Sequence, residues 1–284
     1  MCNAPTFFQR TMWKDFAPFL EQYRENMDQY MDDWWIVTSN DKAGWALHVQ
    51  AIHNFLDTCE KHSYFLKAYK CEIMQPQIRL LGWLITGEGL HINPSKVIGI
   101  LEWPRMLTSV RQVWKTLGVL GYQWPFIQEF ASIAQPIVEL TKKGKTFKWT
   151  NACHETLEAL IEKVTTTPVL VYSDLEWPFK MEVDAFAYAV EAILSQKDNQ
   201  GLKRDIGYYS KALNPAECNY DIWDREFLAV IKALGNWRHL LIGMPHKIIV
   251  RTDHANLQYY RLPQKVNWCI ARRINFIAEF PLEL

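Results

Sequence analysis

Two neighbouring aspartates are the first residues in this chain whose types and spacing point to chemistry. Asp32 and Asp33 stand in the stretch DQYMDDWWIVTSN, between two short apolar runs. Paired carboxylates in a tight turn offer the hard oxygen ligands that divalent ions such as Mg²⁺ prefer. The pattern therefore predicts a metal-binding turn, and the rest of the chain must show which reaction that metal would serve.

Three further carboxylates lie where an unpaired charge is costly. Asp184 ends the apolar run FKMEVD, Asp253 ends the run IIVRTD, and Glu226 falls within the apolar stripe of a helical pattern. Each acid also has an ordinary structural explanation, because strand-end aspartates often cap turns and Arg225 or Arg238 could pair with Glu226. Taken together, the three acids favour a site for two Mg²⁺ ions that clamp a phosphodiester for in-line hydrolysis.

Composition limits the classes of protein that fit. The length of 284 residues suggests two domains, or one domain with a substantial extension, and the 49% of apolar residues is enough for real cores. The formal net charge is zero, so overall charge gives no support to nucleic-acid binding, although it leaves room for a local basic path. The stretch TKKGKTFKW carries four lysines, which form either a solvated loop or a phosphate-contacting one: Lys142, Lys143, Lys145 and Lys148.

The six cysteines are scattered and form neither a CxxC pair nor a Cys/His metal pattern. No signal peptide is visible, so we expect reduced thiols in an intracellular protein, with cytoplasm and nucleus both open. No apolar run approaches the ~20 residues of a membrane span, so no membrane partner is expected.

Apolar periodicity predicts alternating helices and strands in the first half of the chain. We expect helices over residues 3–23 and 43–62, strands over 34–39 and 78–86, and then short helices between 94 and 143. Pro104, Pro125 and Pro136 are expected to separate those short helices.

The pattern changes after residue 167 to several strands, a helix, a strand and another helix. Strands are expected over residues 179–186, 188–196, 204–210 and 246–253. One long helix is expected over 214–234, with Asn214 as N-cap, Pro215 at N1 and Glu217 at N3 in a capping-box pattern. The expected fold class is therefore α/β (α+β), with a mixed sheet in the second half.

These motifs, in this order, resemble the reverse transcriptase–RNase H segment of gypsy-class LTR retrotransposon polyproteins. In the first half, YMDD looks like the polymerase metal-binding turn, and NAP..FQR resembles the helix before it. LKAYKCE resembles the element that follows the turn. The primer-gripping hairpin and the start of the thumb are resembled by LGWLIT with GLHINPSKV. The thumb and connection are resembled by FIQEFASIAQPIVELTKK with FKWTNACHETLEALIEKVTTTPVL. VDAFAYAVEAILSQ, the stretch around YDIWDREF, and VRTDHANLQYY resemble the RNase H half.

The resemblance implies roles for individual residues. Asp32 and Asp33 would be polymerase metal ligands, and Gln9 would lie near the template–nucleotide pair. Lys67 or Lys70 could help to neutralise the leaving pyrophosphate, and the resemblance does not choose between them. The first three acids of the RNase H site would be the three already singled out on chemical grounds: Asp184, Glu226 and Asp253. The implied cofactor is Mg²⁺ or Mn²⁺, and the implied partners are RNA, DNA and RNA–DNA hybrids, with deoxynucleotides if the polymerase were complete.

The same resemblance divides the chain into a partial palm (1–93), a thumb and connection (94–167) and an RNase H-like domain (168–284). It also implies that both sites are cut by the termini, because the family takes one polymerase aspartate from upstream of the NAP helix and a fourth RNase H acid from beyond AEFPLEL. We therefore expect two-metal phosphodiester chemistry by descent, with polymerase activity lost. The alternative is an inactive remnant with at most weak nucleic-acid binding.

Several positions depart from the family pattern. Phe186 stands where serine is usual, Glu191 where glycine is usual, Trp124 where arginine is favoured, and Trp268 with Cys269 where two arginines are common. Each change can arise from one C-to-T transition, so we hypothesise a decaying copy marked by cytosine mutation. Alignment of the gene with intact sister copies tests this, and departures spread evenly over all substitution types would refute it.

Overall fold

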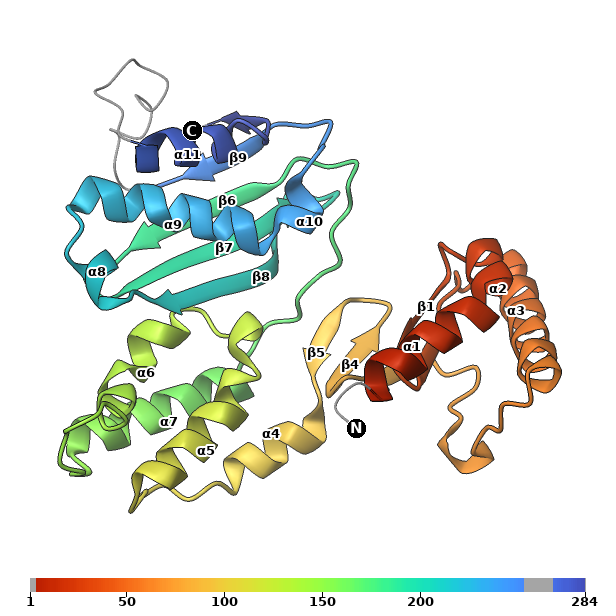
Figure 1. The fold of residues 1–284 in the computed structure, drawn as a ribbon, viewed down its shortest axis with the longest axis horizontal. Coiled ribbons are helices and arrows are strands. Elements are labelled where there is room, and N and C mark those ends of the chain that lie inside the picture. Colours follow the sequence, from red (N-terminus) through yellow and green to blue (C-terminus); the bar gives the residue numbers. More distant parts are fainter. Residues whose placement is uncertain (1–3, 253–267, 284) are drawn as a thin grey trace. The chain divides into compact units, whose positions relative to one another are not determined.

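The computed structural model describes residues 4–252 and 268–283 and divides into two compact units. The first unit is Met1–Gln75 and the second is Pro76–Leu284. Each unit has its own buried core, and each is described here by itself. Most of the elements are labelled in Figure 1.

The first unit is a small hairpin packed with helices. Its elements are α1 (Ala4–Asp15), α2 (Ala17–Gln22), β1 (Met27–Tyr30), β2 (Asp33–Ile36), α3 (Lys42–Lys61) and the 3₁₀ turn η1 (Ala68–Lys70). The prediction of one helix over residues 3–23 was wrong, because the helix is interrupted at Phe16. Pro18 lies in the first turn of α2, where its missing N–H costs least, so a new helix starts there.

Aromatic rings fill the core of the first unit. Phe16 is fully buried, and its ring centre lies 4.6 Å from that of Trp34 and 5.5 Å from that of Phe55. Tyr64 closes the cluster and donates a hydrogen bond from its hydroxyl to Asp15 Oδ2 at 2.8 Å. Trp34, directly after the aspartate pair, therefore anchors β2 to the helices.

The second unit begins with a three-stranded antiparallel sheet. Its strands are β3 (Gln77–Leu80), β4 (Trp83–Thr86) and β5 (Leu90–Ile92). The single strand expected over residues 78–86 was wrong, because the chain reverses at Leu81 and Gly82. Both have positive φ, 48° and 80°, as a tight type I′ hairpin requires.

A group of helices follows: α4 (Pro94–Leu101), α5 (Val110–Gly121), the 3₁₀ turn η2 (Trp124–Phe126), α6 (Phe130–Glu139) and α7 (Asn151–Thr165). Pro104 lies between α4 and α5, and Pro125 lies in η2, as expected. Pro136 does not separate two helices, however, because it lies inside α6. Among their buried apolar residues are Val113, Leu157 and Leu160, which pack in one cluster.

The second unit then forms a five-stranded sheet in the order β10-β9-β6-β7-β8. The strands are β6 (Lys180–Ala185), β7 (Ala189–Lys197), β8 (Lys203–Ala212), β9 (Ile248–Arg251) and β10 (Leu282–Glu283). The pairs β6–β7 and β7–β8 are antiparallel, whereas β9 is parallel to β6 and to β10. This mixed sheet confirms the expected fold class.

Four helices accompany the sheet: α8 (Pro215–Cys218), α9 (Ile222–Asn236), α10 (Arg238–Leu241) and α11 (Trp268–Ile277). The capping box at Asn214 is confirmed, since its side chain accepts from Glu217 N at 2.9 Å while Glu217 Oε2 accepts from Asn214 N at 2.9 Å. The single helix expected over 214–234 is nevertheless two. Asp221 caps α9 afresh by accepting from Asp224 N at 2.8 Å.

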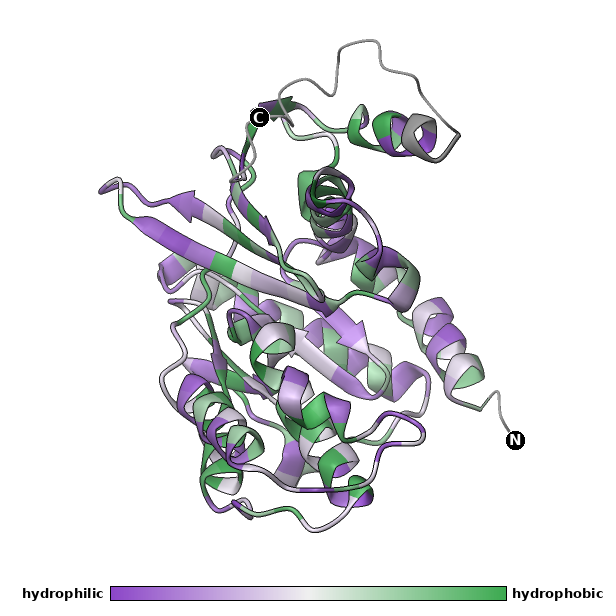
Figure 2. Cartoon of the chain, turned by 90° about the vertical axis from the view of Figure 1, so that its left-hand side faces the viewer, coloured by the Kyte–Doolittle hydropathy of each residue, from purple (hydrophilic) through white to green (hydrophobic). Residues whose placement is uncertain are grey.

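The two faces of this sheet have different coverings (Figure 1). On one face, Met181, Val183 and Leu194 pack with the apolar side of α9. On the other face, α6 lies against β8, and Ile193 packs into the cluster of the preceding helices. In Figure 2, individual helices carry hydrophobic residues along one side and hydrophilic residues along the other, which is the pattern that such two-sided packing requires.

A linker over residues 168–172 joins the two sheets of the second unit. Leu170 forms an antiparallel bridge with Leu90 of β5, with N–O distances of 2.8 and 3.1 Å. The next residue, Val171, donates its N–H to Asp205 O of β8 at 3.0 Å. Gly89 lies so close to Leu170 that an added Cβ would come within 2.3 Å of its carbonyl oxygen.

Candidate functional sites

The aspartate pair lies at the tip of the β1–β2 hairpin, as the sequence indicates. Tyr30 pairs with Asp33, so Met31 and Asp32 form a two-residue turn. Asp32 and Asp33 are both exposed. Met31 has φ of 57°, a left-handed conformation that costs a non-glycine residue about 1–3 kcal/mol and is often found at functional sites.

Gln9 reaches this turn from helix α1. Its side-chain Oε1 accepts a hydrogen bond from Met31 N at 2.7 Å. Gln29, in β1, donates from Nε2 to Met31 O at 2.6 Å. The sequence pointed to Gln9 as a substrate-binding residue, but it gave no signal for these two contacts with the turn.

Lys67 and Lys70 lie at the 3₁₀ turn η1 and are both exposed. Lys67 O accepts a hydrogen bond from Lys70 N at 2.8 Å, so the two lysines belong to one short turn. Nothing in this arrangement favours one of them over the other as a pyrophosphate ligand, and both stay predictions.

Of the three acids expected to form the second site, the structure describes Asp184 and Glu226, and Asp253 lies outside the described residues. Asp184 is near the end of β6, and its Oδ1 accepts from Ala185 N at 2.7 Å. Glu226, on α9, is only 1% exposed, and its Oε2 accepts from the Thr252 hydroxyl at 2.9 Å. Thr252 follows β9 directly, so the residue before Asp253 does reach Glu226.

Strand alternation places Asp184 on the sheet face opposite α9. Asp184 pairs with Glu191 across β6 and β7, so the two side chains belong to the same face. Val183, one residue earlier, is in the core beneath α9. Within residues 4–252 and 268–283, no group of three or more His, Cys, Asp or Glu side chains is placed to hold a metal ion.

Glu191 is the buried acid of this face. It is 7% exposed, and its Oε1 accepts hydrogen bonds from Ser132 Oγ of α6 at 2.8 Å and from Ser210 Oγ of β8 at 2.9 Å. Ser210 in turn accepts from Ala131 N at 2.7 Å. Burial raises the pKa of Glu191 to about 7, against the lowering effect of the two serine hydroxyls. The sequence marked this position as unusual but could not supply its partners, which come from elsewhere in the chain.

Arg225 is a residue near the second site to which sequence reasoning gave no catalytic role. Its Nη1 donates to Phe186 O, just after β6, at 3.4 Å. The neighbouring Asp224 pairs with Arg273 of α11 at 3.1 Å, which ties α11 to α9. Arg225 therefore reaches from α9, the helix that also carries Glu226, to the end of the strand that carries Asp184.

The lysine stretch and Trp124, both noted in the sequence, have defined partners in the structure. Lys142 and Lys145 both pair with Glu139, so part of the charge of the lysine stretch is compensated locally. Trp124 packs edge-on against Tyr209, with ring centres 6.0 Å apart, and Tyr209 packs similarly on Trp237 at 6.2 Å. Trp124 thus joins η2 to the five-stranded sheet.

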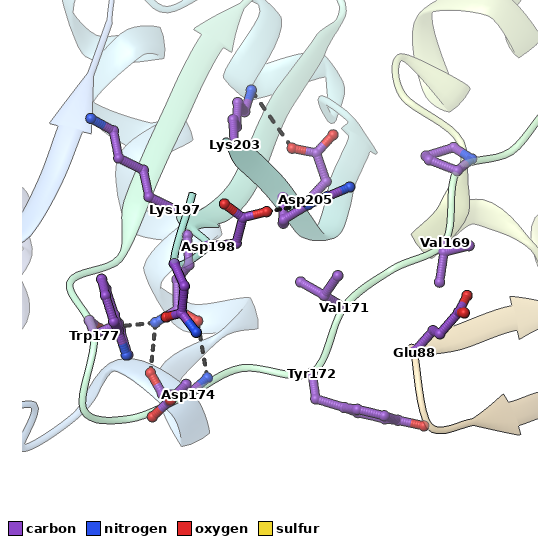
Figure 3. Close-up of a pocket in the computed structure, with 14 residues that line it drawn as sticks. Glu88, Val169, Val171, Tyr172, Asp174, Trp177, Lys197, Asp198, Lys203 and Asp205 are labelled. Carbon is purple, nitrogen blue, oxygen red and sulfur yellow. Dashed lines mark hydrogen bonds and ion pairs between the residues drawn. The ribbon is translucent and has the colours of Figure 1, made fainter. Parts of the chain in front are cut away.

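An open pocket of about 650 Å³ lies beside the linker, at the end of the β7–β8 hairpin (Figure 3). Tyr172 and Trp177 line it together with charged side chains of both signs. Most of these charges have partners already, because Arg204 pairs with Asp198 at 2.8 Å and Lys203 approaches Asp205 at 3.7 Å. The pocket has no single charge character and lies apart from the carboxylates discussed above.

Among the described helices, including the 20-residue α3, none has the length and apolar character needed to span a bilayer. The four cysteines that the structure describes are free thiols, as expected: Cys59, Cys71, Cys153 and Cys218. Burial raises the pKa of the Cys59 thiol to about 11, so at neutral pH it stays protonated and unreactive.

Comparison with known proteins agrees with this geometry. Residues 1–85 match the family described as reverse transcriptase (RNA-dependent DNA polymerase), and residues 149–250 match the family described as an RNase H-like domain found in reverse transcriptase. The chain is therefore a reverse transcriptase segment followed by a reverse-transcriptase-associated RNase H-like segment.

The curated relatives place this segment among retrotransposon polyproteins of the gypsy class. The chain is homologous over 90% of its length to the transposon Tf2-3 polyprotein of Schizosaccharomyces pombe, with 30% identity over 259 residues, and equally to the Tf2-4 polyprotein. The resemblance drawn from the motifs is thus confirmed. The matched region is 19% of each relative, so the chain spans about a fifth of their length.

Solved structures share the fold. The foamy viral protease–reverse transcriptase dRH in complex with double-stranded DNA has a TM-score of 0.77 and 18% identity, covering 98% of this chain and 48% of that one. The same viral protein in complex with an RNA/DNA hybrid has a TM-score of 0.75 and 19% identity, covering 96% and 36%. Together with the two family matches, this shared fold supports a palm segment in the first part and an RNase H-like mixed sheet in the second.

Proposed function

We propose that this chain is a nucleic-acid-processing segment whose surviving chemistry is RNase H-type cleavage of RNA–DNA hybrids. The observation that carries the proposal is Glu226, a carboxylate that is 1% exposed within the segment matching the RNase H-like family. Burial of a carboxylate costs free energy unless hydrogen bonds or a cation compensate the charge. Buried ionisable residues are therefore enriched at functional sites, where the charge takes part in binding or catalysis.

By chemical type the available donors suit a divalent cation, although strand register places Asp184 on the sheet face opposite α9, so its carboxylate must turn past the end of β6 to share an ion with Glu226. Asp184, Glu226 and Asp253 would supply carboxylate oxygens, which are the ligands that Mg²⁺ and Mn²⁺ prefer. When bound, such ions activate water and stabilise the leaving 3′ oxygen of a phosphodiester. The Thr252 hydroxyl, 2.9 Å from Glu226 Oε2, orients that carboxylate. Arg225, on α9 with its guanidinium beside the end of β6, is suited to contact a substrate phosphate.

For the reverse transcriptase segment we propose an inherited site rather than a working one. Asp32 and Asp33 would be its metal ligands, with Gln9 near the template–nucleotide pair and Lys67 or Lys70 near the pyrophosphate. The wider assignment of palm to residues 1–93, thumb and connection to 94–167 and RNase H-like domain to 168–284 belongs to the same proposal. RNA, DNA and their hybrid are the proposed partners, in keeping with the nucleic acids bound to the structural neighbours.

The purified 284-residue chain should show no measurable primer extension. Two exposed aspartates on one turn give too few fixed oxygen ligands for the paired metals of nucleotide transfer. The measurement is incorporation of deoxynucleotides on a primed RNA template with Mg²⁺ or Mn²⁺, with a complete reverse transcriptase as positive control. Template-dependent synthesis that disappears in Asp32→Asn would contradict this expectation.

Hybrid cleavage tests the main proposal. We expect slow cleavage of the RNA strand, stronger with Mn²⁺ than with Mg²⁺, and complete loss in Asp184→Asn because a metal-ligating oxygen becomes an amide. Asp174→Asn is a matched control, since it makes the same chemical change at an exposed residue outside the proposed ligand set. Cleavage that persists unchanged in Asp184→Asn would refute the assignment.

A second candidate is a non-catalytic remnant that binds nucleic acid weakly. The observation in its favour is Glu191, an acid that pairs across the sheet with Asp184 where the family pattern has glycine. A fixed negative charge or a buried proton there alters the field at the first proposed ligand. Absence of cleavage by the wild-type chain, together with measurable binding of a labelled hybrid, would support this candidate.

A further inference from the structure

In the turn that carries the aspartate pair, side chains form hydrogen bonds with both the main-chain N–H and the main-chain carbonyl of Met31. Met31 N donates to Gln9 Oε1 at 2.7 Å, and Met31 O accepts from Gln29 Nε2 at 2.6 Å. Gln9 comes from α1, 22 residues before Met31, whereas Gln29 lies in β1 of the hairpin itself. One residue is thus fixed by two glutamines from different elements.

The backbone of Met31 needs such support. Its φ of 57° is the left-handed conformation that tight hairpin turns require and that glycine, asparagine or aspartate usually provides. Methionine pays the steric penalty of a Cβ in this conformation without a short polar side chain to compensate it. Strain of this kind persists only where the surroundings over-determine it.

We propose that Gln9 and Gln29 are positioning residues that hold Met31 in its left-handed conformation and thereby fix the direction of Asp32 and Asp33. The two side chains act by opposite chemistry. Gln9 serves through its carbonyl oxygen, an acceptor, and Gln29 serves through its amide nitrogen, a donor. Gln29 is 5% exposed, so its orientation is set by packing as well as by the bond.

Because Gln9 accepts and Gln29 donates, substitution by glutamate should have different results at the two positions. Glutamate keeps a side-chain acceptor but, when ionised, has no hydrogen to donate. Gln9→Glu should therefore preserve the bond to Met31 N, while Gln29→Glu should break the bond to Met31 O and place a negative charge beside a carbonyl oxygen. Gln9→Ala and Gln29→Ala should each remove one bond.

The measurement is made on the full chain labelled with ¹⁵N at methionine, with the Met31 signal assigned through Met31→Leu. We expect amide hydrogen exchange at Met31 to accelerate about tenfold in Gln9→Ala, as loss of one protecting hydrogen bond implies, and to change little in Gln9→Glu. Both Gln29 variants should shift the Met31 signal and its HN–Hα coupling. Arg10→Ala, an exposed neighbour on α1, is the matched control and should change neither quantity.

Met31→Gly separates positioning from general damage. Glycine adopts the left-handed conformation without strain, so Gln9→Ala should disturb the turn much less in a Met31→Gly background than in the wild type. Because this background has no methionine at position 31, the turn is followed in both backgrounds at the Asp32 amide of uniformly ¹⁵N-labelled chain. Equal disturbance in both backgrounds, unchanged exchange in Gln9→Ala, or equal acceleration by Gln9→Glu and Gln9→Ala would overturn the proposal.

The functional half of the inference rests on the proposed metal-binding role of Asp32 and Asp33. Binding of Mn²⁺ near the turn is measured as paramagnetic broadening of the Met31 signal. Gln9→Ala should weaken this broadening, and Gln9→Glu should not. Broadening that is absent in the wild type would refute the metal role alone, because the exchange rates decide the positioning role without metal. Broadening present in the wild type and undiminished in Gln9→Ala would refute the link between the two.

Discussion

Replacement of Glu191 by glutamine should remove most of the pH dependence of stability of the second unit between about pH 4.5 and 7. The carboxyl of Glu191 has a pKa of about 7 in the folded chain and an ordinary value of 4.5. Below pH 4.5 the group is protonated in both the folded and unfolded states, so it adds no penalty. As the pH rises, the unfolded chain loses the proton first, and the folded state is progressively destabilised until its own carboxyl ionises near pH 7.

The size of this effect follows from the shift. A difference of roughly 2.5 pH units corresponds to about 3 kcal/mol of folding free energy at pH 8, which Glu191→Gln should recover relative to its effect at pH 4. Ser132 and Ser210 can hydrogen-bond a glutamine as well as a carboxyl, so the side chain keeps its neighbours. The Oε2 atom of Glu191 is buried without a hydrogen-bond partner, which is why the charged form gains too little from its surroundings.

Urea unfolding followed by far-ultraviolet circular dichroism at pH 4, 6 and 8 measures the effect. The difference in unfolding free energy between Glu191→Gln and the wild type should grow with pH and level off above 7. Glu176→Gln, an exposed carboxylate of the same unit, is the control and should give no comparable trend. A difference that is the same at all three pH values would contradict the assigned cause.

Truncation of Phe227 should have the largest effect on stability of any single substitution considered. Its ring is 1% exposed, stacks on Trp223 at 5.3 Å with an interplanar angle of 17°, and belongs to the core between α9 and the five-stranded sheet. Phe227→Ala should destabilise the second unit by about 3–5 kcal/mol, because it removes buried apolar area and leaves a cavity. Whole domains are stable by only about 5–15 kcal/mol, so the variant should be close to unfolding at 37 °C.

The control for this prediction is Trp114→Ala. Trp114 is 60% exposed on α5, so an equally drastic truncation should cost less than about 1 kcal/mol. Denaturant midpoints and thermal midpoints of both variants give the comparison. A loss below about 1 kcal/mol in Phe227→Ala would show that α9 does not depend on this ring.

Local signals in the sequence predicted the elements well where one residue type decides the conformation. The capping box at Asn214 and the aspartate turn of β1–β2 were both predicted from a few adjacent residues. The same reasoning failed where two elements share one apolar pattern, as at Leu81–Gly82 and at Asp221. A two-residue reversal or a new N-cap interrupts the hydrogen bonds without interrupting the periodicity of apolar residues.

Contacts between distant residues could not be predicted from the sequence. The hydrogen bonds of Glu191 join positions separated by 59 and 19 residues, and the contact of Gln9 with Met31 joins positions separated by 22. Asp184 and Asp253 of the second site were proposed from their places at the ends of apolar runs, and Glu226 from its place within the apolar stripe of a helix. Their residue types and places suggested that chemistry from the sequence, whereas the sheet face that Asp184 occupies depended on strand register.

The linker over residues 168–172 should couple the unfolding of the two sheets of the second unit. Its main chain bonds to both sheets, since Leu170 pairs with the edge of one sheet and Val171 donates to the edge of the other. Peeling the linker from the first sheet leaves backbone groups of Leu90 without their partner, and peeling it from the second does the same to the carbonyl of Asp205. The two sheets should therefore melt in a single transition, and a cut made between them would weaken both products.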